Sequence, residues 1–479
     1  MVTGQRTVLI DGTRLNCREV VEVARQSAPV RLAGEGLERA RAAARAVREI
    51  AASGDVYGRT TGVGANRDVT AVDPTGHGRR LLRSHAAGAG PALGVAETRA
   101  MMVVRLNQLA AGGSGVEPAV LEALADALNS GKLPAIRRLG AIGTGDLHAL
   151  ASLGLRLLGE ASWQDGSTSP LSLDPRDAAA LMSSNAATLG EAALALEDVR
   201  AQLQASVAIA ALALLAVGGD PHAYDPVVQR ARPHPGQQLV AARMRELLAG
   251  QAVHPSRIQD PYGYRALPQA HGPALDAATQ LQRVLSVDMN SASENPLVDV
   301  AGRRVLHNGN FHSAYLAGAL DSMSLALYRT ATLGAARLSS LMDAGLTGLT
   351  PFLAVGPEGS SGLMILEYVA QSCLAELRRS ATPATVATAV ISRGVEDHAP
   401  FSTEAARSLA QGVAAYRVLL SCELVAATRA VRMRGLAATG PLGDALDMAL
   451  AALDPRTEDR PLDADLDVAE GLLAALAGV

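Results

Sequence analysis

The feature that most constrains the fold is a long apolar segment with helical periodicity. From residue 177 to 218, apolar side chains recur at helical spacing and gather on one side, and residues 205–219 carry no charge. This uncharged run is shorter than the roughly 20 residues that a membrane-spanning helix needs. We therefore expect a long helix that is buried in a protein core.

The composition favours a core of closely packed helices and a small-molecule partner. Hydrophobic residues make up 48% of the 479 residues but aromatic residues only 3%, so Ala, Leu and Val fill the core. A formal charge of -4 gives no basic surface for nucleic acid or anionic lipid. The cysteines show neither metal-ligand spacing nor a disulfide pattern, and no apolar signal segment begins the chain. We expect a cytoplasmic protein without a metal, nucleic-acid or membrane partner.

Helical signals extend along most of the chain, which predicts a mainly α protein. Residues 36–52 are rich in Ala and Arg, and residues 101–130 hold two helical segments with a Gly-rich break between them. The last part is helical with breaks expected at Pro441, Pro455 and Pro461. Residues 8–12 suggest a short strand and turn. We expect three regions, which are an N-terminal region at 1–180, a central long-helix bundle at 181–430 and a helical tail at 431–479.

A Gly-rich turn, Gly143-Thr144-Gly145, runs directly into a helix that begins after Asp146. Asp is a favoured N-cap, so we expect the Asp146 carboxylate to accept amide hydrogens of that helix's first turn. The turn would then face the positive end of the helix dipole. Taken alone, the pattern is equally that of an ordinary capped helix after a loop.

The chain resembles the aromatic amino acid ammonia-lyase family, which contains histidine and phenylalanine ammonia-lyases. The resemblance extends from about residue 5 to 430, and its segments occur in the family's order. They are Tyr57-Gly58 with Thr61-Gly62 and Gly64 on a lid loop, Ser84-His85-Ala86-Ala87-Gly88, residues 143–146, residues 231–237, residues 259–265, residues 290–297, residues 308–312, residues 361–364 and residues 396–398. This resemblance implies long, near-parallel central helices of the fumarase/aspartase-like type. It also implies a homotetramer with active sites built from several chains.

In this family an Ala-Ser-Gly run cyclises into an electrophilic methylidene-imidazolone (MIO), whereas this chain has Gly143, Thr144 and Gly145. Flanking glycines permit the close approach that ring closure requires, but Thr is stiff at χ1 and would leave an ethylidene whose methyl shields the attacked carbon. The alternative is that no ring forms and that Thr144 caps the next helical turn. We expect no external cofactor, because the only Lys, Lys132, lies in no cofactor-binding pattern.

The resemblance also assigns catalytic roles. Tyr57 on the lid loop would take the β-hydrogen, which requires its pKa to fall from about 10. Tyr262 would donate a hydrogen bond near the amine or the electrophile, and Arg265 would grip the substrate carboxylate with its planar fork. His148 follows Thr144 by one helical turn and would reach the same cavity. Each has a structural alternative, such as lid packing, a surface ion pair or a histidine bonded to its own helix.

Five further residues are candidates for substrate binding. His85 and Glu396 would form a polar end of the pocket, which indicates a substrate with a polar side chain. Phe311 and Met364 would pack against the substrate side chain, although such residues are more often part of a core. Asn185 lies where the family has an Asn-Gly-Thr run, and it would replace the support that this run gives to the electrophile.

Three functions remain open at this point. The first is a carbon–nitrogen lyase or aminomutase that acts on a free amino acid, histidine-like or otherwise polar. The second is an enzyme on the same scaffold that uses Tyr57 and His148 as acid and base, without the electrophile, on another carboxylate substrate. The third is a binding or regulatory protein that has lost catalysis. Retention of Tyr57 and Arg265 favours either enzyme, whereas Thr144 favours the second and third functions.

Overall fold

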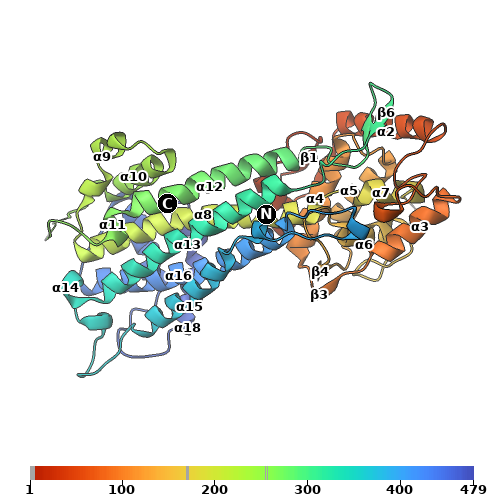
Figure 1. Cartoon of the computed structure of the whole chain (residues 1–479). Coiled ribbons are helices and arrows are strands. Elements are labelled where there is room, and N and C mark those ends of the chain that lie inside the picture. Colours follow the sequence, from red (N-terminus) through yellow and green to blue (C-terminus); the bar gives the residue numbers. More distant parts are fainter. Residues whose placement is uncertain (1–5, 169–171, 254, 256) are drawn as a thin grey trace. The chain divides into compact units, whose positions relative to one another are not determined.

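The computed structural model describes residues 6–168, 172–253, 255 and 257–479, and its mainly helical structure confirms the predicted fold class (Figure 1). The chain forms two compact units, each assembled from three separate segments. Unit 1 contains Met1–Glu197, Leu281–Leu320 and Pro383–Arg407, and unit 2 contains Asp198–Gln280, Asp321–Thr382 and Ser408–Val479. The predicted central region at 181–430 therefore contributes to both units.

Unit 1 combines short helices with three two-stranded sheets. The expected strand at residues 8–12 is β1, which pairs in parallel with β2, whereas β3–β4 and β5–β6 are antiparallel. The predicted Ala- and Arg-rich helix is α2, and the Gly-rich break separates α4 from α5. The elements of unit 1 are β1 (Val8–Ile10), α1 (Cys17–Arg25), β2 (Val30–Leu32), α2 (Gly34–Ala51), η1 (Gly64–Asn66), α3 (Pro74–His85), β3 (Ala89–Ala92), α4 (Val95–Ala110), α5 (Pro118–Ser130), β4 (Arg137–Leu139), α6 (Leu147–Leu157), η2 (Pro175–Asp177), α7 (Ala178–Met182), β5 (Leu297–Asp299), β6 (Arg304–Leu306), η5 (Ala384–Val386) and η6 (Ser392–Gly394).

Four long helices contribute residues to both units. They are α8 (Ala186–Val217), α12 (Leu267–Asp288), α13 (Ala314–Met342) and α16 (Ser402–Met433). The uncharged segment is the second half of α8, and its residues from 205 to 217 are all buried, as predicted. Two helical stretches, Pro175–Val217 and Ser402–Met433, are long and apolar enough to cross a membrane. However, 83% and 67% of their apolar windows are buried inside the protein, as in ordinary core helices.

In unit 2 the long helices run side by side and are joined by buried polar side chains (Figure 1). Arg337 on α13 donates to Glu423 on α16 from Nε at 2.5 Å and from Nη2 at 2.9 Å. His271 on α12 bonds to the Leu203 carbonyl oxygen on α8 at 3.1 Å and to Thr330 Oγ1 on α13 at 2.9 Å. Because such groups are costly to leave unpaired, these bonds fix how the four helices are aligned.

The remaining elements of unit 2 are shorter and include the predicted helical tail. They are η3 (Pro221–Tyr224), α9 (Pro226–Ala231), α10 (Pro235–Leu248), α11 (Tyr262–Arg265), α14 (Ala344–Thr347), η4 (Pro351–Leu353), α15 (Ile365–Ser380), α17 (Gly440–Ala452) and α18 (Asp463–Leu476). Pro455 and Pro461 lie between α17 and α18, as expected. The break expected at Pro441 is also present, because α16 ends at Met433 and α17 begins at Gly440. Pro441 lies in the first turn of α17, where it removes no helical hydrogen bond.

Candidate active site

The Gly-rich turn before α6 is held through its backbone. The Gly143 carbonyl oxygen accepts hydrogen bonds from Ser313 N at 3.2 Å and from Ser313 Oγ at 2.7 Å. Gly145 N donates to Asn185 Oδ1 at 2.9 Å. Gly143 and Gly145 have φ angles of 92° and 117°, which side-chain-bearing residues rarely adopt. The structure therefore brings together three predicted site residues, Gly143, Gly145 and Asn185.

Three of the long helices have their N-termini in unit 1, beside this turn. Asn185 directly precedes α8, Ser313 directly precedes α13, and Ser402 is the first residue of α16. Asn185 Nδ2 donates to the Phe311 carbonyl oxygen at 2.6 Å, and Ser402 Oγ lies 2.6 Å from Ser313 Oγ. Helix N-termini carry partial positive charge, so the surroundings of the turn favour negative charge.

The Asp146 carboxylate does not cap α6, so that prediction is wrong. It is 1% exposed and accepts hydrogen bonds from Thr188 N at 2.8 Å and Thr188 Oγ1 at 2.9 Å, in the first turn of α8. Its backbone, with φ of -87° and ψ of 51°, lacks the extended conformation of an N-cap residue. Burial raises the pKa of Asp146, although the bonds from Thr188 oppose that shift. The carboxylate thus ties the turn to α8.

Gly143 and Gly145 are held through their backbone groups, whereas the side chain of Thr144 is not held. The residue is half-buried, and within the described chain its hydroxyl has no hydrogen-bond partner and caps no turn of α6. At Gly143, by contrast, there is no room for a side chain. A Cβ there would lie 2.7 Å from Ser402 Oγ and 2.9 Å from Ser402 N. An alanine at this position would therefore collide with the start of α16.

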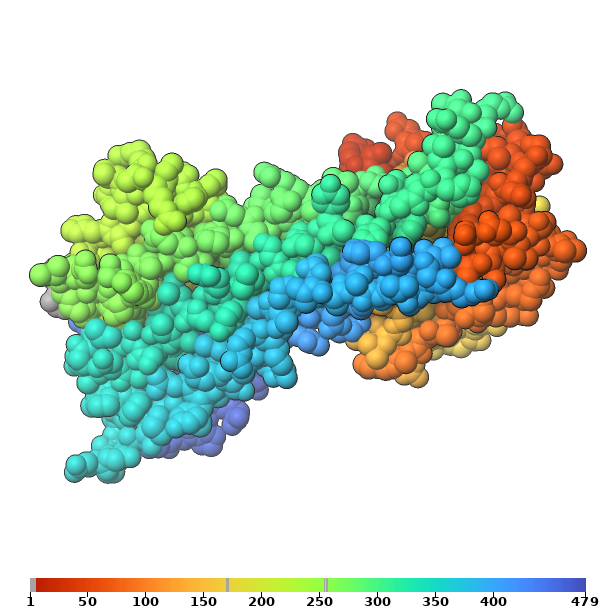
Figure 2. Space-filling model, in the orientation of Figure 1, coloured from red at the N-terminus to blue at the C-terminus, as the bar shows by residue number. Residues whose placement is uncertain are grey.

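The candidate base Tyr57 lies on a loop that packs against residues 383–407, which Figure 2 shows at the surface beside N-terminal residues of the same unit. Tyr57 Oη accepts a hydrogen bond from Gly64 N at 2.8 Å. A Cβ on Gly64 would lie 3.0 Å from Glu396 Oε1, so Gly64 brings Tyr57 and Glu396 together. Burial raises the pKa of Tyr57, and Glu396 raises it further, although the Gly64 N–H opposes the shift. This direction is opposite to the one that a base requires.

His148 packs tightly against glycine backbone. A Cβ on Gly140 would lie 2.6 Å from its Cγ, and one on Gly88 would lie 2.8 Å from its Cδ2. Its Nε2 bonds to the Arg137 carbonyl oxygen at 2.9 Å, and its buried Nδ1 has no partner among the described residues. Through these contacts, His148 packs against the segments that flank the turn.

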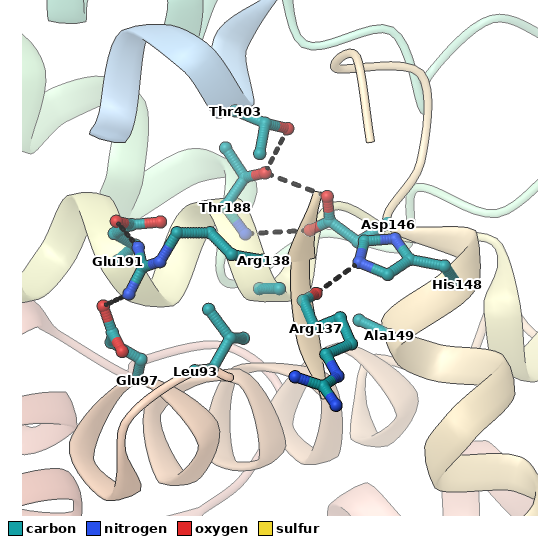
Figure 3. Close-up of a pocket in the computed structure, with 11 residues that line it drawn as sticks. Leu93, Glu97, Arg137, Arg138, Asp146, His148, Ala149, Thr188, Glu191 and Thr403 are labelled. Atoms are coloured by element: carbon teal, nitrogen blue, oxygen red, sulfur yellow. Dashed lines mark hydrogen bonds and ion pairs between the residues drawn. The ribbon is translucent and has the colours of Figure 1, made fainter. Parts of the chain in front are cut away.

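A small cavity of about 20 Å³ lies beside His148 and Asp146 (Figure 3), with room for one water molecule. Arg138 lines it and pairs with Glu97 at 2.5 Å and Glu191 at 2.9 Å. The described residues around this cavity do not include Thr144, although we expected His148 to share a cavity with it. The cavity is therefore part of an ion-pair cluster and is too small for an amino acid.

His85 and Phe311 contribute no side-chain hydrogen bond to the turn among the described residues. The half-buried His85 ends α3, and its Nδ1 bonds within that helix to the Leu81 carbonyl oxygen at 2.9 Å and to Ser84 Oγ at 3.0 Å. No contact among the described residues joins His85 to Glu396, with which it was expected to form a polar end. Phe311 is half-buried, and its backbone carbonyl rather than its ring is bonded to the site.

Sequence reasoning missed three features of this region. Ser313 and Ser402 were not predicted, although each follows a recognised motif closely. His312 Nε2 lies 2.9 Å from His398 Nδ1, so the motifs that contain these histidines are joined. Both histidines lay inside quoted segments, but their pairing depends on two stretches far apart in the sequence.

Three candidates belong to unit 2. The Arg265 guanidinium carbon lies 4.5 Å from the centre of the Tyr262 ring, and Arg265 Nε donates to the Asp260 carbonyl oxygen at 3.0 Å. The terminal nitrogens of Arg265 have no partner in the part of the chain that the structure describes. Tyr262 is 67% exposed, and Met364 is half-buried just before α15. The geometry leaves the Arg265 fork available to a carboxylate.

Comparison with known proteins gives matches along nearly the whole chain. A family model described as aromatic amino acid lyase matches residues 15–454. The histidine ammonia-lyase of Sorangium cellulosum (strain So ce56) is 35% identical over 504 residues, with 96% of each chain covered. A tyrosine aminomutase structure from Streptomyces globisporus has a TM-score of 0.92 at 28% identity, covering 98% of this chain and 97% of that one. A histidine ammonia-lyase structure from Trypanosoma cruzi has a TM-score of 0.91 at 27% identity, covering 98% and 94%.

Proposed function

Because this chain belongs to the aromatic amino acid lyase family, as its motifs predicted, we propose that it eliminates ammonia from a free amino acid or shifts its amino group. The carbon–nitrogen lyase class is that of its full-length relatives. We propose a substrate with a polar side chain, histidine-like, because the Glu396 carboxylate lies beside the lid loop that carries Tyr57.

Residues 143–145 fit the ring-forming group on which this family depends. The Gly143 carbonyl oxygen is held by two donors, and the Gly145 amide is held by Asn185. Thr144 keeps an unbonded hydroxyl that can leave as water. A ring formed from these residues would supply an electrophile that captures the substrate amine. The observation that carries the proposal is that both reacting backbone groups are held while the Thr144 side chain is left free.

The protein's own side chains would then bind the substrate and move its proton. Tyr57 takes the β-hydrogen, and a cationic substrate amine beside its hydroxyl would lower the pKa that burial has raised. Arg265 binds the carboxylate, and Tyr262 donates a hydrogen bond near the amine. Phe311 and Met364 pack against the substrate side chain. His85 would also bind the substrate, at the polar end of the pocket.

The same family resemblance supports a homotetramer with active sites built from several chains. We propose a cytoplasmic location and a small-molecule substrate, with neither nucleic acid nor membrane as a partner. The acid–base alternative without an electrophile has less support, because His148 is packed against Gly140 and Gly88 and bonded to backbone.

Turnover of a panel of amino acids, histidine first, tests this function. We expect the wild-type protein to release ammonia or to yield an amine-shifted product. Tyr57→Phe is the matched variant, because it keeps the ring and removes only the hydroxyl, and we expect a loss of about 100-fold or more in kcat. Equal turnover by this variant would contradict the role of Tyr57. No turnover of any amino acid would contradict this function and would leave two interpretations, an enzyme that acts on another carboxylate substrate or a non-catalytic homologue.

A further inference from the structure

Two buried serines form a chain of hydroxyl groups that ends on the Gly143 carbonyl oxygen. Ser313 is 7% exposed and Ser402 is 0% exposed. Ser313 Oγ donates to the Gly143 oxygen at 2.7 Å and lies 2.6 Å from Ser402 Oγ. Ser313 has one hydroxyl proton, which this bond uses, so Ser402 must donate to Ser313.

We propose that Ser313 and Ser402 activate the Gly143 carbonyl for the ring closure of residues 143–145. This inference rests on the proposed function, because it concerns how the electrophile forms. Ser313 supplies both donors of an oxyanion hole, its N–H and its hydroxyl. Ser402 is a positioning residue whose hydroxyl orients and polarises that of Ser313.

The position of Ser313 strengthens this assignment. Ser313 directly precedes α13, a helix of 29 residues, so the partial positive charge of that N-terminus adds to the two donors. On the other side of the turn, Asn185 Oδ1 accepts the Gly145 N–H at 2.9 Å. The attacking nitrogen and the attacked carbonyl are thus held by different segments, in an orientation set before any reaction.

Ring closure at this site balances without an oxidant. Gly145 N bonds to the Gly143 carbonyl carbon, and the π pair moves to the oxygen, where Ser313 holds the negative charge. The Gly145 amide proton passes to this oxygen. The oxygen then leaves as water with the Thr144 amide proton, which gives a carbon–nitrogen double bond. A second water forms from the Thr144 hydroxyl and its α-hydrogen, which leaves the ethylidene.

The glycine at position 143 is matched to Ser402. Because a Cβ at 143 would lie 2.7 Å from Ser402 Oγ, the start of α16 can approach the turn only when residue 143 is glycine. The methyl of Thr144 hinders the ring chemistry relative to serine. The hydroxyl chain would compensate by polarising the carbonyl more strongly.

The test follows the mass of the peptide spanning residues 138–156 over time after refolding the full chain. Ser313→Ala and Ser313→Gly remove the hydroxyl but keep the N–H, and glycine costs little at a position before a helix. Ser184→Ala is the matched control, because the Ser184 hydroxyl is buried nearby but bonds to Gln108 at 2.6 Å. All variants are also made on Thr144→Ser, which supplies the usual hydroxyl of the family.

We expect the wild-type and Ser184→Ala proteins to lose two water molecules at the same rate. In both Ser313 variants this loss should be about 100-fold slower. Ser402→Ala should slow the loss less. Ser313 variants that fold, by circular dichroism, and dehydrate at the parental rate in both backgrounds would overturn the inference while leaving the proposed function intact. An unmodified Thr144 protein beside a dehydrated Thr144→Ser protein would overturn the electrophile in the natural chain. The role of Ser313 would then be decided in the serine background.

Discussion

The helix bundle of unit 2 and the Gly-rich turn of unit 1 hold their buried polar groups in different ways. In unit 2, Arg337 and Glu423 bond to each other across helices, and both side chains are at most 1% exposed. At the turn in unit 1, Ser313 and Asn185 instead bond to the backbone of Gly143 and Gly145. Pairing between side chains fixes how helices are aligned, whereas holding a backbone leaves the enclosed side chain, Thr144, free to react.

The largest effect should come from breaking the helix-to-helix pair in unit 2. Glu423→Leu leaves Arg337 as an unpaired buried charge, which we expect to lower the free energy of unfolding by about 3–5 kcal/mol. Chemical denaturation measures this loss. Glu404→Gln removes the exposed pair with Arg407 and should cost less than about 1 kcal/mol. A double variant, Arg337→Met with Glu423→Leu, should recover stability. A Glu423→Leu variant as stable as the wild-type protein would contradict the role of this ion pair.

The free energy of unfolding should also decrease as the pH is lowered, because of His271. Burial lowers its pKa to about 3, so below the unfolded value of about 6.5 only the unfolded state takes up this proton. The contribution is absent above pH 6.5 and amounts to a loss of about 2 kcal/mol at pH 5. His271→Gln should remove this part of the slope between pH 7 and pH 5. Identical slopes for the two proteins would count against the buried, neutral histidine.

In unit 1, removal of the Asp146 carboxylate should cost more stability than removal of an ordinary helix cap. Asp146→Ala removes two bonds to Thr188 and should cost about 2 kcal/mol, measured by thermal unfolding. Asp73, an exposed cap that accepts from Gly76 N at 3.0 Å, provides the matched comparison. Asp73→Ala should cost about 0.5–1 kcal/mol. If the two variants lose the same stability, Asp146 is no more than a local cap.

The smallest effect on stability should come from Arg265, whose terminal nitrogens the described part of unit 2 leaves without partners. Arg265→Lys keeps the charge but loses the fork, so stability should change by less than about 0.5 kcal/mol. The value of kcat/KM should nevertheless fall at least about tenfold, because the carboxylate loses its bidentate partner. Steady-state kinetics with the best substrate measures this. Unchanged kinetics would show that the carboxylate binds elsewhere.

Sequence reasoning predicted the elements and motifs better than the contacts between them. The uncharged apolar run predicted the buried half of α8, because a helix that is buried on every side lacks charged side chains in its local sequence. The same reasoning assigned Asp146 to the helix that follows it, whereas its partner Thr188 lies 42 positions further along. Ser313 and Ser402 were missed because a hydroxyl acquires its role only when distant segments meet. The direction in which the pKa of Tyr57 shifts likewise depends on burial, which no local sequence pattern predicts.

The central claim is that residues 143–145 react after folding, and the mass of the peptide spanning residues 138–156 from freshly purified wild-type protein tests it most directly. We predict that this peptide has lost two water molecules and that fragmentation places the loss within residues 143–145. An unmodified peptide from folded protein would contradict the claim. The chemistry would then have to come from Tyr57 and Arg265 without a backbone electrophile.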